Sequence, residues 1–333
     1  KIERISKNQV SVQKRLLEKK LIEEVGNNYT TILNGFSVTT SYGKIKEIEK
    51  QKGIKKVILS DTYNQLEAKK EGNDTIDAVT NVVDVYETGI FNSSRVEYNG
   101  EGTAVAVLDS GFDCSHEVFL SQPEKQIITP ASIDGIIEDS IAYKMTPGLK
   151  VSDVYYSKKI PFAYDYADKD PDVTPYDSEH GTHVAGIIGG SSETITGVAT
   201  HTQLVLMKVF PNLQEGAETA DILAALEDAV LLKVDAINMS LGSACGFVRE
   251  EDGNEINRVY DKIYDSGINL VCAASNDYNS SYGSEQGNNN KVTNPDSATV
   301  GSPSTYEAAL SVASISGTKS RYIIGNGEQV IFF

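Results

Sequence analysis

The chain has 333 residues, 40% of them hydrophobic, and at ~150 residues per domain this length predicts two domains with room for part of a third. A net charge of −17 argues against nucleic acid as a partner, no run approaches the ~18 apolar residues of a membrane span, and three cysteines cannot build a disulfide scaffold. Residues 1–72 nevertheless hold 15 Lys and Arg against 9 Asp and Glu, whereas the remainder holds 15 against 38. Two domains of opposite sign should attract each other, but an ordinary solvated pair of basic helices would give the same composition.

Residues 1–65 predict a small α+β domain. Apolar residues at helical spacing predict a first helix whose buried face carries Val10, Leu17 and Leu21 and is widened by Leu16, Ile22 and Val25. Asn34-Gly35 predicts a turn and Gly53 predicts the end of a helix, and these two signals divide the remainder of the domain into its elements. Around these signals we expect strands over 29–32, 36–39 and 54–59 and a helix over 44–52, in the order helix–strand–strand–helix–strand.

Residues 66–100 are polar and predict an exposed linker, after which strands alternate with helices. Each strand is a short, continuous apolar run, which indicates burial on both faces. The fold class is therefore α/β, a parallel sheet with helices on both faces. We expect strands over 103–108, 203–209, 236–239 and 268–273, helices over 181–190, 220–232 and 254–265, and a long, partly ordered excursion over 120–178.

Three motifs lie at the ends of these elements, where open α/β folds place their sites. Asp109 follows the first strand, His180 opens a helix, and Asn276 follows a later strand. Taken one by one, these residues are ordinary: a helix cap, a capping or surface histidine, and a turn residue. A zinc site built on His180 and His183 lacks a glutamate and any further ligand, so we assign no metal ligand.

Together the motifs carry more information. Asp109-Ser110-Gly111 followed by the string from His180 to Gly186 (HGTHVAG) resembles the aspartate and histidine motifs of the subtilisin-like serine peptidases, in that family's chain order. The resemblance implies a subtilisin-like fold and a serine endopeptidase that cuts proteins. In it, His180 is the general base, Asp109 orients its imidazole, and Asn276 donates a hydrogen bond to the oxyanion.

The same resemblance implies a substrate-binding strand whose backbone pairs with the peptide to be cut. Asn238 to Gly242 is similar to that strand, although an ordinary strand end would read the same way. The family usually has Gly at the position of Ser275. The substrate-binding residues expected from the resemblance are Ser240, Leu241, Gly242, Ala273, Ala274 and Ser275.

Residues 1–65 resemble the propeptide of these enzymes, which implies an intramolecular inhibitor released by a cut in the linker, between Tyr63 and Val79. Residues 159–168 and 301–305 resemble the cell-envelope proteinases of the lactocepin kind. This resemblance implies a secreted, cell-envelope protein, with 101–316 as an incomplete catalytic domain and 317–333 as the start of an inserted protease-associated domain.

The family's serine lies in a Gly-Thr-Ser string, which does not occur in this sequence. Lys1 is not an initiator, and the sequence stops in a strand-like run, so we expect the serine to lie beyond this chain and the chain alone to hydrolyse nothing. The chemistry needs no cofactor. Structural calcium is compatible with such an enzyme, but the acidic positions from Asp168 to Glu179 have Val173 where a calcium loop needs Gly. The alternative function is a catalytically inactive subtilase that acts as a surface binding protein or adhesin.

Overall fold

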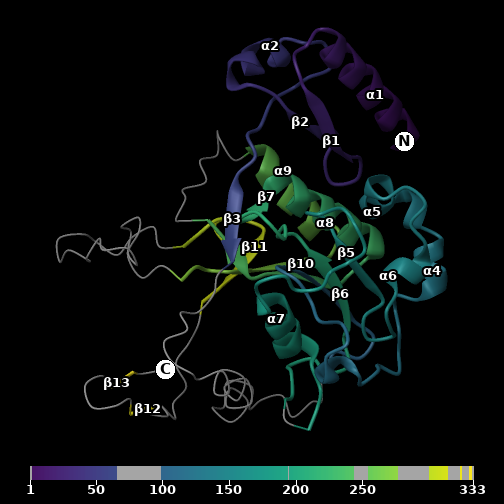
Figure 1. The fold of residues 1–333 in the computed structure, drawn as a ribbon, viewed down its shortest axis with the longest axis vertical. Helices are drawn as coiled ribbons and strands as arrows, with labels where there is room; N and C mark the ends of the chain where they lie inside the picture. The colour runs from purple at the N-terminus through teal and green to yellow at the C-terminus, as the bar shows by residue number, and fades with distance from the viewer. Residues whose placement is uncertain are drawn as a thin grey trace.

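The computed structural model describes residues 2–65, 99–193, 195–243, 254–276 and 300–313, and two short strands beyond them, β12 (Ile323–Ile324) and β13 (Val330–Ile331). The larger part of the molecule is built on a six-stranded parallel sheet (Figure 1). In spatial order its strands are β11 (Ala309–Val312), β10 (Asn269–Ala273), β8 (Ala236–Met239), β4 (Ala104–Asp109), β6 (Gln203–Lys208) and β5 (Phe162–Asp165).

Helices cover both faces of this sheet, which confirms the α/β prediction. Ala106 and Leu108 of β4 belong to the main hydrophobic core together with apolar residues of α8 (Thr219–Leu232) and α9 (Asn254–Asp265). Val107, which lies between them and points the other way, packs in a second cluster with Ala185 of α7 (His180–Gly189). The predicted strands at 103–108, 203–209, 236–239 and 268–273 and the three predicted helices are therefore confirmed to within one residue at each end.

The two edge strands, β5 and β11, were missed by the sequence analysis. β5 is four residues long and fully buried, so it is too short to show a period. It lies inside the excursion over 120–178, which also contains short helices and is described throughout. These are η2 (Glu117–Phe119) just before it, and α4 (Pro130–Asp134), η3 (Ile137–Asp139), α5 (Ile141–Met145) and α6 (Val151–Val154) within it.

The N-terminal unit, residues 2–59, packs a helix, α1 (Ile2–Glu18), against an antiparallel pair, β1 (Glu24–Tyr29) and β2 (Gly35–Thr39). η1 (Tyr42–Lys44) and α2 (Ile45–Glu49) follow. The predicted buried face of α1 is wrong in part. Leu16 is buried as expected, but Val10 is 61% exposed and Leu17 is 43% exposed, and the helix buries Gln9 and Gln13 in their place.

The orientation of α1 is set by polar contacts, which the spacing of apolar residues in the sequence does not reveal. The Gln9 side-chain amide donates to the carbonyl oxygens of Tyr29 and Gly35, at 2.8 and 3.1 Å, and Gln13 donates to Asn28. These bonds turn the glutamine face of α1 toward the β1–β2 hairpin.

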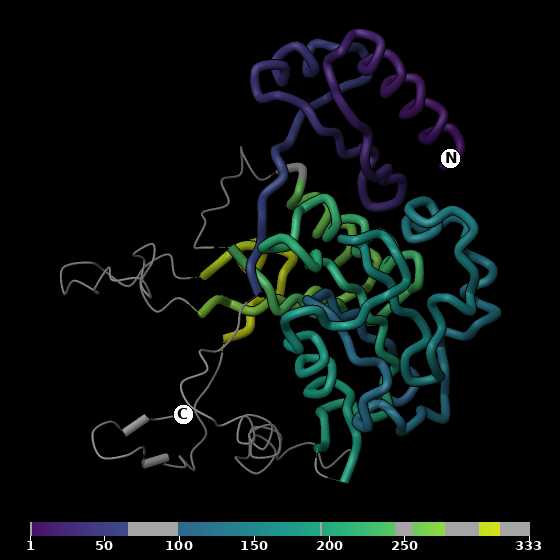
Figure 2. The backbone as a smooth tube through the Cα atoms, in the orientation of Figure 1, coloured from purple at the N-terminus to yellow at the C-terminus, as the bar shows by residue number. Residues whose placement is uncertain are grey.

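The predicted strand over 54–59 is also wrong. Ile54 and Val57 are both partly buried against the small core of the N-terminal unit, and their spacing of three residues does not fit the period of two that a strand requires. The strand that follows is β3 (Thr62–Gln65), and it pairs outside the unit. β3 lies between β7 (Ala217–Glu218) and β9 (Leu241–Gly242), antiparallel to both. Figure 2 shows the chain leaving the N-terminal unit and running into the larger part of the molecule at this point.

Candidate active site

The Asp109 and His180 side chains meet at the carboxyl edge of the sheet. Asp109 is the last residue of β4 and 1% exposed, and His180 is the first residue of α7. The His180 Nδ1 and Asp109 Oδ1 atoms are 2.7 Å apart. Because an ionised carboxylate only accepts hydrogen bonds, Nδ1 carries the proton and Nε2 of the neutral ring is left as an acceptor. This is the tautomer that a general base needs.

Glycines allow the two motifs to approach each other. A Cβ atom at Gly181 would lie 2.4 Å from the carbonyl oxygen of Gly111 and 3.1 Å from the Asp109 Cβ. The start of α7 can therefore reach the end of β4 only with Gly at position 181. The Asp109 Oδ1 atom also accepts the Ser110 N–H at 2.7 Å, which fixes the orientation of the carboxylate.

Asn276 follows β10 at the same edge of the sheet, since β10, β8 and β4 are adjacent parallel strands. Ser275 before it has a φ of +147°, a conformation that favours glycine. Glycine, the residue that the family usually has here, would adopt this conformation with less strain than Ser275 does. Ala274 is fixed on both sides: its N–H donates to Val312 and its carbonyl accepts the Gly301 N–H, both at 2.8 Å.

The segment predicted to bind substrate, 238–242, spans the end of β8 and the whole of β9, and an extended segment, β3, is paired with β9. Leu241 pairs with Gln65 and Gly242 with Asn64, in the antiparallel sense. Ser240 lies just before β9, where its hydroxyl accepts from the Asn238 side chain at 3.1 Å. Ala273 ends β10, which packs beside β9. β9, β3 and β7 make a three-stranded sheet, and we call the space between β7 and β9, which β3 fills, the groove.

The opposite wall of this groove, β7, was not found from the sequence. Ala217 pairs with Tyr63, and the Thr219 N–H donates to the Asp61 carbonyl at 3.0 Å. Gly216 just before β7 has a φ of +79°, and a Cβ atom there would lie 2.3 Å from Thr62 Cγ2. Gly216, which precedes α8 in the sequence, was the only sequence signal that the backbones of β3 and β7 approach each other closely here.

The side chain of Tyr63 fills an apolar pocket below the groove. Tyr63 is 4% exposed and belongs to the main core cluster with Ala217, Leu241 and Tyr306. The Tyr306 ring lies 4.7 Å from that of Tyr260, centre to centre. Burial raises the pKa of the Tyr63 hydroxyl above its ordinary value. At the end of β3, the Ser178 hydroxyl contacts Gln65 Oε1 at 2.9 Å, two residues before His180, so β3 leads toward the Asp109–His180 pair.

The tip of the β1–β2 hairpin rests on α8. The Glu227 carboxylate is 3% exposed and accepts the N–H groups of Thr30, Thr31 and Ile32 at 2.5, 2.8 and 3.3 Å. The Tyr29 hydroxyl donates to the Ala220 carbonyl at 2.8 Å. Tyr29 and Ile32 are both part of the main core cluster, so the contact is apolar as well as hydrogen-bonded.

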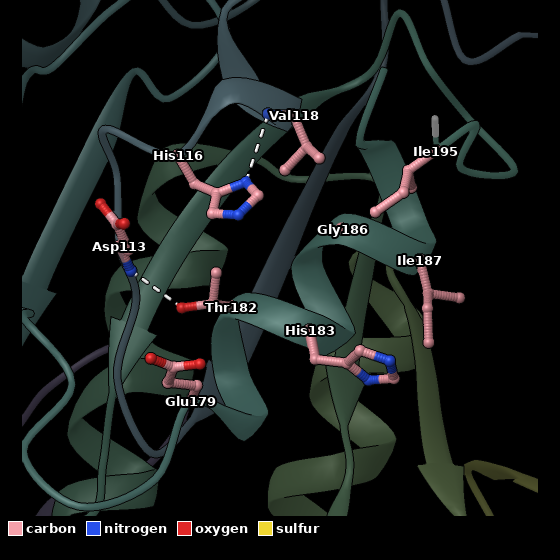
Figure 3. Close-up of a pocket in the computed structure, with 9 residues that line it drawn as sticks. All are labelled: Asp113, His116, Val118, Glu179, Thr182, His183, Gly186, Ile187 and Ile195. Atoms are coloured by element: carbon pink, nitrogen blue, oxygen red, sulfur yellow. Dashed lines mark hydrogen bonds between the residues drawn. The ribbon is translucent and has the colours of Figure 1, made fainter. Parts of the chain in front are cut away.

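A pocket of about 200 Å³ lies on the other flank of α7 (Figure 3). Asp113, His116, Glu179 and His183 line it, but His116 Nδ1 accepts the Val118 N–H at 3.3 Å. Burial and the neighbouring His180 lower the pKa of His183. Across the described ranges, no three His, Cys, Asp or Glu side chains are arranged to hold a metal ion.

The acidic loop considered for calcium uses its carboxylates internally. Asp170 accepts the Asp172 N–H at 2.8 Å, and Asp172 accepts the Thr174 N–H at 3.0 Å, which lowers the pKa of Asp172. The ammonium group of Lys208 lies among these acids and pairs with Asp165 and Asp168. Of the acids considered for calcium, Asp168 is thus already paired with an ammonium group, and structural calcium in this enzyme stays a prediction.

Several predictions fall outside the described residues or remain predictions. Of the predicted linker, 66–100, residues 66–98 lie outside the described part of the chain. The same holds for the predicted cut, between Tyr63 and Val79, wherever it falls beyond Gln65, and for most of the segment 317–333. The domain boundaries and the catalytic roles of the site residues stay predictions. In the part of the chain that the structure describes, no helix is long and apolar enough to cross a membrane.

Comparison with known proteins gives a consistent result. A model of the subtilase family matches residues 100–327. The PIII-type proteinase of Lactococcus lactis subsp. cremoris is 32% identical over 316 residues, which cover 92% of this chain and 15% of that protein. The C5a peptidase of Streptococcus pyogenes is 34% identical over 228 residues, 66% of this chain and 18% of that protein. The chain thus spans less than a fifth of the length of these relatives.

Among solved structures, fervidolysin from Fervidobacterium pennivorans, a keratinolytic enzyme related to subtilisin, is similar at a TM-score of 0.51 and 15% identity, covering 81% of this chain and 39% of its own. That likeness concerns the fold alone. The family match covers the sheet, the Asp109–His180 pair and the groove strands β7 and β9. The chain belongs to the subtilase family.

Proposed function

We propose that this chain is the part of a serine endopeptidase that supplies the general base, the substrate groove and an inhibitory N-terminal segment. The observation that carries the proposal is the 2.7 Å contact between His180 and Asp109 at the end of an occupied strand-pairing groove. His180 Nε2 takes the proton of a serine hydroxyl, and Asp109 stabilises the imidazolium that forms. Asn276 donates to the oxyanion of the tetrahedral intermediate.

The substrate is an extended segment of protein. β3 occupies the groove with backbone pairing on both sides, which is how a peptide adds to a sheet edge without regard to most of its side chains. Specificity comes from pockets for the side chains that point inward, as Tyr63 does. Of the predicted substrate-binding residues, Ser240, Leu241 and Gly242 lie on or next to β9, which forms one wall of the groove. Ala273, Ala274 and Ser275 lie at the end of the neighbouring strand β10.

Residues 1–65 act as a propeptide that inhibits in the same molecule. Their last strand, β3, fills the groove. The tip of the β1–β2 hairpin donates backbone hydrogen bonds to Glu227 of α8. A cut in the linker beyond Gln65 releases the covalent connection but leaves these contacts. We further propose a secreted, cell-envelope location, in keeping with the resemblance noted in the sequence, and no cofactor for the chemistry.

The test uses the chain extended by the residues that follow it in its gene. We expect a fluorophosphonate probe to label this protein and the purified enzyme to hydrolyse casein. His180→Ala should lower kcat by several orders of magnitude, since the triad acts as a unit. His201→Ala, which changes a histidine hydrogen-bonded to Thr200, is the control. Absence of labelling in the unchanged protein would favour the inactive, adhesin-like alternative.

A further inference from the structure

A buried lysine lies beside the candidate catalytic aspartate. Lys208 ends β6, and its register partners are Asp109 on β4 and Asp165 on β5. All three are at most 1% exposed. Charged side chains are rarely buried unless they are paired, so the partners of the Lys208 ammonium indicate which parts of the structure it holds together.

The Lys208 ammonium, at the end of β6, binds two carboxylates at the end of β5 and in the loop that follows it. It bonds to Asp165 Oδ2 and lies 3.2 Å from Asp168 Oδ2. The same Asp168 oxygen accepts the Asn212 N–H at 3.0 Å. Asp168 is therefore a link between the lysine and the backbone that follows β6.

That backbone, residues 209–216, leads directly into the groove strand β7. Val209 and Phe210 at its start are buried in the main core, but residues 213–215 are exposed, with Leu213 83% exposed, so apolar burial does not hold this later part. Among the described hydrogen bonds, the one that a side chain elsewhere makes to residues 210–215 comes from Asp168. Ala217, which follows this stretch, pairs with Tyr63 of the strand that occupies the groove.

We propose that Lys208 and Asp168 are positioning residues for substrate: through Asn212 they hold the 209–216 connection so that β7 is ready to pair with an extended peptide. The proposal rests on the proposed function of the groove. Neither side chain touches the reacting atoms. A buried, paired ammonium group suits a positioning role, because such a pair adds little to the free energy of folding but fixes where its partner side chains lie.

The first experiment measures hydrogen exchange on the intact chain. Asp168→Asn removes the charge and weakens both bonds, and the peptides covering 60–65 and 209–220 should exchange about tenfold faster, the factor that corresponds to ~1.4 kcal/mol for one charge-assisted hydrogen bond. Asp170→Asn, in the same loop, is the matched control because its carboxylate accepts only a local N–H. Unchanged exchange in Asp168→Asn, or equal changes in the two variants, would overturn the proposal.

The second experiment is a readout that general destabilisation would not give. In the serine-bearing protein without residues 1–65, Asp168→Asn should raise KM about tenfold for peptides long enough to reach β7 while kcat stays within about twofold. A peptide too short to reach β7 should keep both parameters. A loss confined to kcat, or an equal loss for both substrates, would contradict the proposal. If no variant hydrolyses any substrate but exchange still accelerates, the proposed peptidase function fails, and what stands is that Lys208 and Asp168 hold the 209–216 connection beside β3.

Discussion

The contact between Glu227 and the β1–β2 hairpin allows a quantitative prediction about the N-terminal unit. The carboxylate accepts three successive backbone N–H groups and is almost fully buried. Glu227→Ala leaves those N–H groups without their acceptor at an interface that also buries Tyr29 and Ile32. The hairpin tip should therefore open more often, while the core of the larger sheet should not.

The magnitude follows from the geometry. Truncating one partner of a buried, hydrogen-bonded charged contact costs about 2–5 kcal/mol. The Ile32 bond is long at 3.3 Å, so we expect a value near the lower part of this range, ~3 kcal/mol, or roughly 100-fold in the opening equilibrium. Glu227→Gln keeps one acceptor oxygen and should cost about half as much.

The assay is hydrogen exchange of the Thr30, Thr31 and Ile32 amides in the intact chain, with the amides of β4 as an internal reference. Glu215→Gln, at an exposed acid, controls for the change in net charge. Equal protection of the three amides in Glu227→Ala and in the unchanged protein would refute the reasoning, because it would show that apolar packing alone holds the hairpin.

Three further predictions concern the same groove and interface. Added salt should change docking of the N-terminal unit little between 0.1 and 1 M, because no ion pair among the described residues joins it to the larger part; loss of amide protection at high salt would contradict this. Burial, with the charge of Glu218 next, raises the pKa of Asp221, which faces Asn27 of the N-terminal unit, to about 7. If the docked unit supplies this burial, its opening, corrected for intrinsic exchange, should become more frequent as the pH rises from about 4 to about 7 and level off above 7; a flat or reversed trend would exclude Asp221 as the cause. Ser275→Gly should raise the free energy of unfolding in urea by about 1 kcal/mol by relieving the strain at φ +147°, and a lower value would show that the serine side chain compensates for it.

The local order of the chain was largely readable from its residues. Continuous apolar runs gave four of the six sheet strands and three helices, because a buried strand or helix needs apolar residues wherever it packs. Asp109 and His180 were recognisable because the chemistry constrains their neighbours, above all the glycine at 181. The overall α/β class, the family and the residues of the candidate dyad therefore follow from the sequence by itself.

Other features depend on partners far away in the chain and left no local pattern. β7 and β9 are two residues long and exist because β3, some 150 to 180 positions away, lies between them. The buried face of α1 is polar because Gln9 meets the carbonyl of Tyr29, and Glu227 is buried because three N–H groups satisfy it. A polar side chain is buried only when its partner is in place, and only the tertiary structure supplies that partner.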